Sequence, residues 1–325
     1  MRIQRIWPLI ELKRAEEARA AIDALLGSGG AEVLRQDSVL RMLQKDFTAA
    51  RVSAQKALAA NPADVRALEL IMRCAVGDKQ PERGIEIVRN HAAQNRKLAA
   101  VQMFLGRIEL QAGNTAQARA AFEAAKAADP GKLDAEWTLI DLDIGEGKLE
   151  DARRRIAPLI HSSEANATAK LALVEETAGN YEAAIQHYRK VLTIKPFDAG
   201  ILNNLAYILT EFIGNPSEAL RFAQTAKELA PEDAAIDDTI GWTYYRMGRY
   251  GDAVRHLEQA VKLGPNARRH AHLAMAYARH GDGARARQML RTALKIDPGL
   301  PEASLAQKVV GDGAPAARQS TGLRD

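Results

Sequence analysis

Apolar and polar positions alternate along this chain with the period of a helix, and the pattern is clearest from Ala234 to Pro265. Residues three and four positions apart lie on one face of a helix. On that spacing the stretch predicts two amphipathic helices, roughly Ala234–Met247 and Tyr250–Leu263. A turn at Gly248 joins them, and Gly264-Pro265 ends the second.

The small residues of this stretch fall where the two helices would meet. Gly241 in the first helix and Ala253 in the second carry almost no side chain, so the backbones can approach closely. Ile240, Tyr244 and Leu257 then fill the space around them. The stretch is therefore predicted to be a tightly packed helical hairpin.

One small residue of the second helix recurs along the whole chain at spacings of 32 to 35 residues. In five of the repeats an apolar residue follows it four positions later and a small or apolar one seven positions later, so all three share one helical face. These pairs are Phe122 and Ala125, Ile156 and Leu159, Tyr188 and Val191, Leu257 and Ala260, and Leu290 and Ala293. Glycines recur in the turns, and prolines, which end helices, follow the second helices. The small residues are Ala18, Ala50, Gly84, Ala118, Ala152, Ala184, Ala219, Ala253 and Ala286; the turn glycines are Gly113, Gly147, Gly179, Gly248 and Gly281; the prolines are Pro62, Pro130, Pro196, Pro231, Pro265 and Pro298.

This periodicity predicts an all-α chain of about nine helix–turn–helix repeats. Residues 1–30 are expected to form an irregular helix pair or cap, interrupted at Trp7-Pro8. A capping helix is expected at 301–310, with Leu305 and Val309 facing inward, and a disordered tail at 311–325. The repeats are predicted at 31–64, 65–98, 99–132, 133–164, 165–198, 199–233, 234–266 and 267–300.

Three repeats depart from the pattern. The first helix of 31–64 has Asp37 and Ser38 where a large residue beside a small one is expected. The repeat at 133–164 is two residues short, and Pro158 should bend its second helix. The repeat at 199–233 has one extra residue in its turn, within EFIGNPSEA.

A 34-residue helix–turn–helix unit with small and large core residues at fixed offsets and a closing proline resembles the tetratricopeptide repeat (TPR) family. The resemblance implies a right-handed superhelical solenoid, in which consecutive repeats stack. It also implies that the first helices line a concave face that holds a peptide or helix of a partner protein.

The run from about residue 199 to 300 further resembles C-terminal repeats of bacterial arrays associated with exopolysaccharide export and exosortase systems, through LNNLAYILTEFIGNPSEALRFAQTAKELAPEDAAIDDTIGWTYYRMGRY. Those relatives are commonly lipid-anchored or periplasmic. The apolar run Ile6 to Ile10 is too short for a secretory signal. We therefore expect a cytoplasmic protein if Met1 is the native start, and a periplasmic or envelope-associated one if the chain is a fragment.

Composition and motifs argue against an enzyme. Hydrophobic residues make up 47% of the chain and aromatic ones only 5%, which is typical of many short packed helices. No phosphate loop, metalloprotease motif or nucleophile elbow occurs. His270 and His272 lie two apart on a helix and point to different sides, and the single Cys74 can form neither a disulfide within the chain nor a cysteine zinc site. We predict no catalytic residue, no metal, no cofactor and no membrane span.

The net charge of +4 and pI of about 9.1 raise the question of nucleic acid. Segment 267–300 holds seven Lys/Arg against two Asp/Glu, whereas 133–164 holds four against eight. An acidic middle interrupts the continuous basic track that phosphate binding favours. The favoured interpretation is that these charges form solvated helix faces. RNA binding through 267–300 remains an alternative.

Residues of the first helices that lie between the core positions are candidates for partner binding. Aromatic residues and arginine are enriched where binding energy concentrates, and the resemblance implies that asparagine at the position of Asn204 bonds a peptide backbone. The array holds no ladder of such asparagines. The candidates are Asn203, Asn204 and Tyr207; Asp238, Trp242, Tyr245 and Arg246; and Arg269, His272, Met275 and Arg279.

The favoured hypothesis is a non-enzymatic scaffold for protein–protein interaction. Tyr207, Trp242, Tyr245, Arg246 and Arg279 would form a concave patch that receives a partner's peptide or helix. The alternative for Trp242 and Tyr245 is packing between adjacent repeats. Rival functions are RNA binding and an accessory role in an envelope polysaccharide-export or exosortase system.

Overall fold

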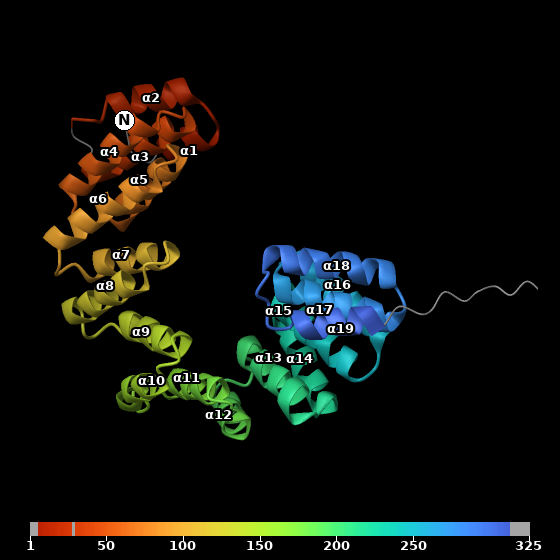
Figure 1. Cartoon of the computed structure of the whole chain (residues 1–325). Coiled ribbons are helices and arrows are strands. Elements are labelled where there is room, and N and C mark those ends of the chain that lie inside the picture. Colours follow the sequence, from red (N-terminus) through yellow and green to blue (C-terminus); the bar gives the residue numbers. More distant parts are fainter. Residues whose placement is uncertain (1–5, 28–29, 313–325) are drawn as a thin grey trace, which may run out of the picture. The chain divides into compact units, whose positions relative to one another are not determined.

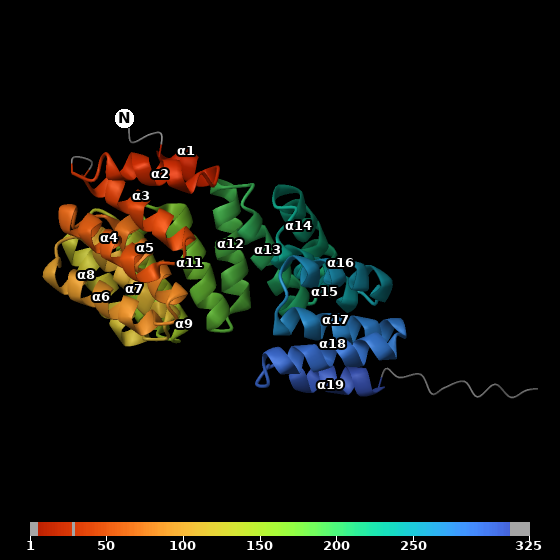
Figure 2. The same cartoon turned by 90° about the horizontal axis from the view of Figure 1, so that it is seen from above.

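The computed structural model describes residues 6–27 and 30–312. Within that part of the chain every regular element is helical and there is no strand. The chain divides into two compact units, Met1–Glu146 (unit 1) and Gly147–Asp325 (unit 2), and each is described by itself. Figures 1 and 2 show the helices of both.

In unit 1 four helix pairs follow one another and a single helix follows them. Within each pair the helices are antiparallel neighbours, and each second helix also contacts the first helix of the next pair. The elements are α1 (Ile6–Glu11), α2 (Ala15–Asp23), α3 (Gly30–Leu43), α4 (Phe47–Ala60), α5 (Val65–Gly77), α6 (Pro81–Gln94), α7 (Ala99–Gln111), α8 (Thr115–Ala128) and α9 (Asp134–Gly145).

Unit 2 repeats the arrangement, with one short helix before four pairs and one helix after them. The elements are α10 (Leu149–Ile156), the 3-10 turn η2 (Ala157–Leu159), α11 (Glu164–Thr177), α12 (Tyr181–Ile194), α13 (Ala199–Ile208), the π-helical turn η3 (Leu209–Ile213), α14 (Pro216–Leu229), α15 (Ala234–Arg246), α16 (Tyr250–Leu263), α17 (Ala267–His280), α18 (Gly283–Ile296) and α19 (Ala303–Asp312). The predicted all-α solenoid of stacked helix pairs is confirmed.

The recurring small residues are the points of closest approach, as predicted. All nine are buried, and the eight alanines among them have no exposed surface. In α15 a methyl group added to Gly241 would lie 2.6 Å from Cγ of Leu257 and 3.1 Å from its backbone nitrogen. In α7 a methyl group on Gly106 would overlap the ring of Phe122. A larger residue at either glycine would force the two helices apart.

Turns and helix ends also follow the sequence. The five predicted turn glycines all have positive φ, between 71° and 97°. Three other turns of unit 1 hold Lys13, Lys45 and Lys79, whose φ values of 57° to 62° place ordinary side chains in the left-handed region. Each of the six second helices with a closing proline ends two residues before it.

The irregular repeats each have a local cause. Helix α10 ends at Ile156, two residues before Pro158. The chain then continues as the 3-10 turn η2, which contains Pro158. The extra residue of 199–233 is taken up by η3, which is followed by Gly214 with φ 75°. Trp7-Pro8 does not interrupt its helix as expected. Pro8 lies in the first turn of α1, where no intrahelical N–H bond is lost.

Partly buried ion pairs join successive repeats. An arginine directly after the small residue of a second helix pairs with an acid of the next repeat in Arg51–Asp78 (2.9 Å), Arg119–Asp143 (2.6 Å) and Arg153–Glu175 (2.9 Å). Arg19 pairs in the same way with Asp37, which is 2% exposed. Burial alone would raise the pKa of Asp37, but hydrogen bonds from Ser53, Arg19 and Arg41 hold it below its ordinary value. Asp37 therefore replaces an apolar core residue with a fully bonded carboxylate.

The C-terminal helix α19 packs on α17 and α18. Ala306, Val309 and Val310 are buried, whereas Leu305 is 51% exposed. The expectation that Leu305 faces inward is wrong, because the buried face of α19 is formed by Ala306, Val309 and Val310. Residues 311 and 312 belong to α19, so the expected disordered tail is wrong for them, and 313–325 lie outside the described residues.

Replacing Gly241 by alanine should destabilise unit 2 by about 1–3 kcal/mol, because the added methyl overpacks the contact with Leu257. Gly145→Ala is the matched control. Nothing lies within 4 Å of its added methyl, and Gly145 is the last residue of α9, so stability should change by no more than about 0.5 kcal/mol. Urea unfolding followed by circular dichroism measures both. Equal shifts in the same direction would contradict the close approach.

Replacing Arg89 by alanine should cost about 2 kcal/mol at pH 7, less than a fully buried pair because Arg89 is half exposed. Arg89 holds the pKa of the buried Glu109 carboxyl below its ordinary value, and Asn114 also donates to it. The stability that this carboxylate contributes is complete above its unfolded pKa of about 4.3 and is lost as pH falls below it. The stability difference between the two proteins should therefore narrow below about pH 4 in urea titrations. A difference that stays constant to lower pH would refute the link, and Arg96→Ala, an exposed site, is the control.

Candidate functional site

The candidate residues of unit 2 lie on the first helices α13, α15 and α17, but their exposure differs. Asn203, Asn204, Tyr207, Asp238, Tyr245 and Arg269 are half-buried, and Arg246 and Arg279 are exposed. Trp242, His272 and Met275 are 5%, 5% and 0% exposed. The last three belong to the core.

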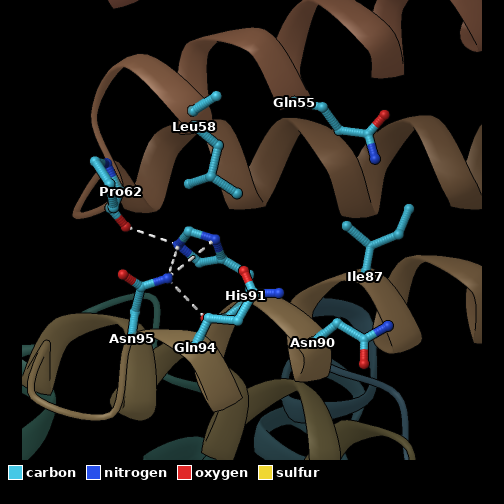
Figure 3. A pocket seen from close by; sticks show the side chains of 9 residues that line it. Gln55, Leu58, Pro62, Ile87, Asn90, His91, Gln94 and Asn95 are labelled. Carbon is cyan, nitrogen blue, oxygen red and sulfur yellow. Dashed lines mark hydrogen bonds between the residues drawn. The ribbon is translucent and has the colours of Figure 1, made fainter.

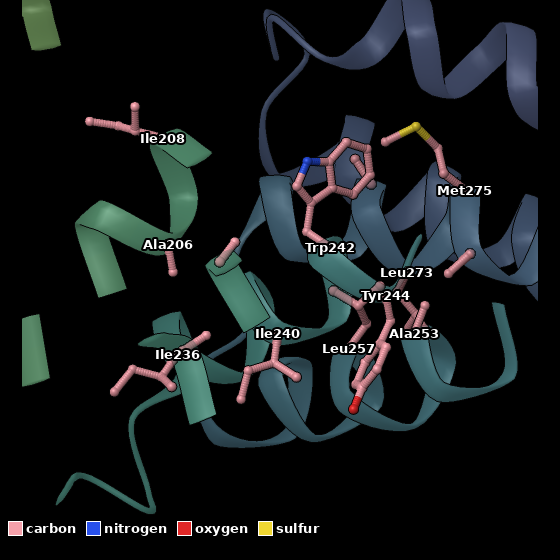
Figure 4. Close-up of a cluster of buried hydrophobic side chains, with 14 of the residues drawn as sticks. Ala206, Ile208, Ile236, Ile240, Trp242, Tyr244, Ala253, Leu257, Leu273 and Met275 are labelled. Atoms are coloured by element: carbon pink, nitrogen blue, oxygen red, sulfur yellow. The ribbon is translucent and has the colours of Figure 1, made fainter. Parts of the chain in front are cut away.

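Trp242 is held on both faces and at its edge. Its ring is stacked on Tyr245 at 4.7 Å and on His272 at 4.2 Å between centroids. Its Nε1 donates a 2.7 Å hydrogen bond to Glu211. In Figure 4 the side chain of Met275 extends toward the same indole.

Partner contact through Trp242, His272 and Met275 is therefore corrected to packing between repeats. By their spacing these three residues lie between the core positions of the first helices, where the sequence predicts a surface. Trp242 is buried between Tyr245 and His272 and beside Glu211, whereas His272 and Met275 lie on α17, on which α19 packs. Every residue of α17 from His270 to Ala278 is buried.

The π-helical turn η3 supplies a residue that the sequence reading missed. Glu211 accepts a hydrogen bond from Trp242 and one from Nη1 of Arg246, each 2.7 Å long. The next residue, Phe212, stacks on Tyr181 at 3.8 Å and meets Tyr207 edge-on at 5.9 Å. The extra residue in EFIGNPSEA was the available signal, since π turns come from single insertions and are frequent at functional sites.

Asn204 belongs to a polar chain that reaches the core. Its Nδ2 donates to the hydroxyl of Tyr188 (3.4 Å), which donates to Glu176 (2.7 Å). Burial raises the pKa values of Glu176 and Tyr207. Asn203 differs, because its Oδ1 is buried and has no hydrogen-bond partner within the described residues.

Two further carboxylates fix the first turns of α15. Asp237 is 1% exposed and contacts Lys227 (2.6 Å) and His256 (3.1 Å). Burial would raise its pKa, but those two partners hold it below its ordinary value. Asp238 lies 2.9 Å from Nδ1 of His272, so this candidate orients the imidazole that covers Trp242.

The basic residues of α17 are mostly engaged. Arg268 pairs with Glu302 at 2.8 Å, and Arg269 donates to the carbonyl of Gly264. His270 Nδ1 lies 2.7 Å from the carbonyl of Asn266. These contacts tie α17 to its neighbours rather than forming an open basic face.

A separate pocket of about 550 Å³ lies on the second helices α4 and α6 of unit 1 (Figure 3). His91 donates from Nε2 to the carbonyl of Pro62 (2.8 Å), and Asn95 donates to the carbonyl of His91 (2.9 Å). The ring is thus occupied in holding the loop after α4. This pocket has no charged side chain and carries no chemistry.

In the part of the chain that the structure describes, no three metal-binding side chains converge on one point. None of the described helices is both long and apolar enough to cross a membrane.

The model of the tetratricopeptide repeat family matches residues 75–132, 138–199 and 239–301, more than half of the chain. Together with the stacked helix pairs, this match shows that the chain belongs to the tetratricopeptide repeat family. Members of this family are typically non-enzymatic and bind other proteins.

Two curated relatives come from Pseudomonas aeruginosa. One, described as a TPR repeat-containing protein, is 39% identical over 85 residues, which is 26% of this chain and 14% of the relative. The other, type IV pilus assembly protein PilF, is 28% identical over 144 residues, 42% of this chain and 57% of PilF. The chain thus spans less than two thirds of either relative.

Solved structures share the fold. The APC/C hetero-tetramer Cut9–Hcn1 gives a TM-score of 0.62 at 18% identity, covering 92% of this chain and 59% of that one. The structure of PilF from Pseudomonas aeruginosa gives 0.51 at 20% identity, covering 66% of this chain and 99% of PilF. At these identities the likeness shows the fold alone.

Trp242→Ala should lower the stability of the protein by about 3–5 kcal/mol, because it empties a packed site and leaves Glu211 without one donor. Trp7→Ala is the matched control, since that indole is 47% exposed and should cost well under half as much. Thermal and urea unfolding compare the two. Similarly small losses of stability in both variants would contradict the burial of Trp242 in the core.

Proposed function

We propose that this protein is a non-enzymatic scaffold whose unit 2 holds an extended segment of a partner protein. The proposed contact residues are the accessible candidates Asn203, Tyr207, Tyr245, Arg246 and Arg279. Asn204 and Asp238 support the contact residues from within the fold. Asn204 hydrogen-bonds Tyr188, and Asp238 contacts His272. Membership in the TPR family supports protein partners.

The fixed placement of Tyr245 and Arg246 is the observation that carries the proposal. Tyr245 is stacked on a buried indole, and Glu211 anchors the guanidinium of Arg246. Side chains already ordered in the free protein lose little entropy on binding. An aromatic ring beside an arginine is also the pairing enriched at binding hot spots.

The double variant Tyr245→Ala/Arg246→Ala should bind the partner at least about tenfold more weakly, since each hot-spot truncation costs more than 1 kcal/mol. Partners are captured from the native organism with the unchanged protein as bait, and titration calorimetry then measures affinity. Arg291→Ala/Lys295→Ala, on the exposed surface of α18, is the control with a comparable number of truncated side chains. Equal capture by all three baits would refute the site, provided that their melting temperatures agree.

A second candidate is an accessory role in an envelope assembly machine. Similarity to the pilus assembly protein PilF in sequence and fold favours pilus-type assembly, and the resemblance of residues 199–300 favours polysaccharide export or an exosortase system. Under this proposal the protein is envelope-associated. Cell fractionation and capture of binding partners distinguish a pilus role from a polysaccharide-export role. A protein found in the cytoplasm that captures neither pilus components nor polysaccharide-export components would exclude both roles.

RNA binding through 267–300 has weaker support. Arg268 and Arg269 are engaged within the fold, and Arg285 lies over the ring of Tyr277 at 5.5 Å. Only α18 presents a row of exposed cations, at Arg287, Arg291 and Lys295. A salt titration with single-stranded RNA decides the matter, because true phosphate contacts lose affinity steeply with salt.

A further inference from the structure

Unit 1 contains a groove of about 470 Å³ between the first helices α3 and α5, bordered by α1. It lies within one unit and shares no residue with the proposed site of unit 2. Its volume is in the range of protein sites that bind small ligands or short peptide segments. None of the candidate residues predicted from the sequence lines it.

The groove has an apolar strip with one prominent aromatic residue. Val39 and Leu70 line it from α3 and α5, and Trp7 stands at its border. Trp7 is 47% exposed, although its Nε1 is bonded to Glu11. A large ring left half in water beside a groove provides contact area to a ligand without any rearrangement.

Two arginines on α5 are available to an anion. Arg66 and Arg73 are exposed, line the groove, and make no ion pair or hydrogen bond within the described residues. They are seven residues apart, so they lie on one face about 10 Å apart along the helix axis. Arg35, in contrast, is consumed by Asp64 and Glu32. The exposed Glu69 between the two free arginines disfavours a negative group at the middle of the groove.

Gln36 supplies an acceptor for a peptide backbone. It lines the groove and is 5% exposed, and its Nε2 donates to Glu32 at 3.0 Å. Its Oε1 has no partner within the described residues. A buried acceptor without a donor is unfavourable. The contact needs one rearrangement, in which the amide turns away from Glu32 and presents this oxygen to a backbone N–H.

From these features we propose that the groove binds an extended acidic segment of a partner protein, with two carboxylate side chains on either side of an apolar one. Side chains two residues apart on an extended chain point the same way and lie about 7 Å apart. That separation is within reach of both flexible arginines. The apolar side chain would lie on the strip near Trp7, and Gln36 would bond the backbone.

The probe is a fluorescein-labelled peptide Glu-Leu-Glu-Leu-Glu, with Gln-Leu-Gln-Leu-Gln as its neutral counterpart, in fluorescence polarisation with the full chain. The acidic peptide should bind at least about tenfold tighter than the neutral one. Arg66→Ala/Arg73→Ala should remove that preference, because both free cations are lost. Gln36→Leu should weaken both peptides by a similar factor of about three, because it removes a contact to the backbone.

Arg96→Ala/Lys97→Ala is the matched control, since it removes the same charge from exposed positions of unit 1 outside the groove. It should change affinity less than twofold. An equal loss in this control, or no preference for the acidic peptide, would overturn the proposal. Loss of binding in Tyr245→Ala/Arg246→Ala would place the peptide on unit 2 instead. If an oligouridylate binds tighter than the peptide and its binding depends on Arg66 and Arg73, the two arginines bind phosphate. That result would also overturn the proposal.

Discussion

The close approach of two helices at a residue with almost no side chain is the constraint on which the rest of this structure depends. At Gly241 and Gly106 there is no room for even one methyl group, and alanines occupy the recurring position in the second helices. This contact fixes each hairpin, and a fixed hairpin presents the same apolar edge to the next repeat. Stability is then a sum of hairpins and the interfaces between them.

Charge adds specificity to these interfaces. Arg119 and Arg153 follow the small residue of their helices directly, so the packing that buries the alanine also delivers the guanidinium to an acid of the next repeat. A buried pair adds little net stability, but a mispaired repeat would leave a buried charge alone. We infer that such pairs favour the correct neighbour among repeats with similar apolar faces. Asp37 shows that a bonded carboxylate can even take the place of the apolar pair.

The insertion in the repeat at 199–233 explains why unit 2 has an ordered polar surface. By forming a π turn, it brings Glu211 between Trp242 and Arg246 and moves Phe212 onto Tyr181. The added residue thus fixes side chains on two neighbouring repeats. The surface of unit 1 is different, since its free arginines and exposed indole are not held in such a network.

The sequence by itself determined the class of fold, the repeats, the turn glycines and the helix ends, because these depend on spacing along one or two helices. It could not determine which first-helix residues face a partner. Trp242 and Met275 have the spacing of surface positions, and only contacts with neighbouring segments bury them, such as those of Trp242 with Tyr245, His272 and Glu211. Likewise, nothing in the spacing of Gln36, Arg66 and Trp7 relates them, since they come from three helices. Burial and convergence depend on contacts between distant segments, and these exist only in the tertiary structure.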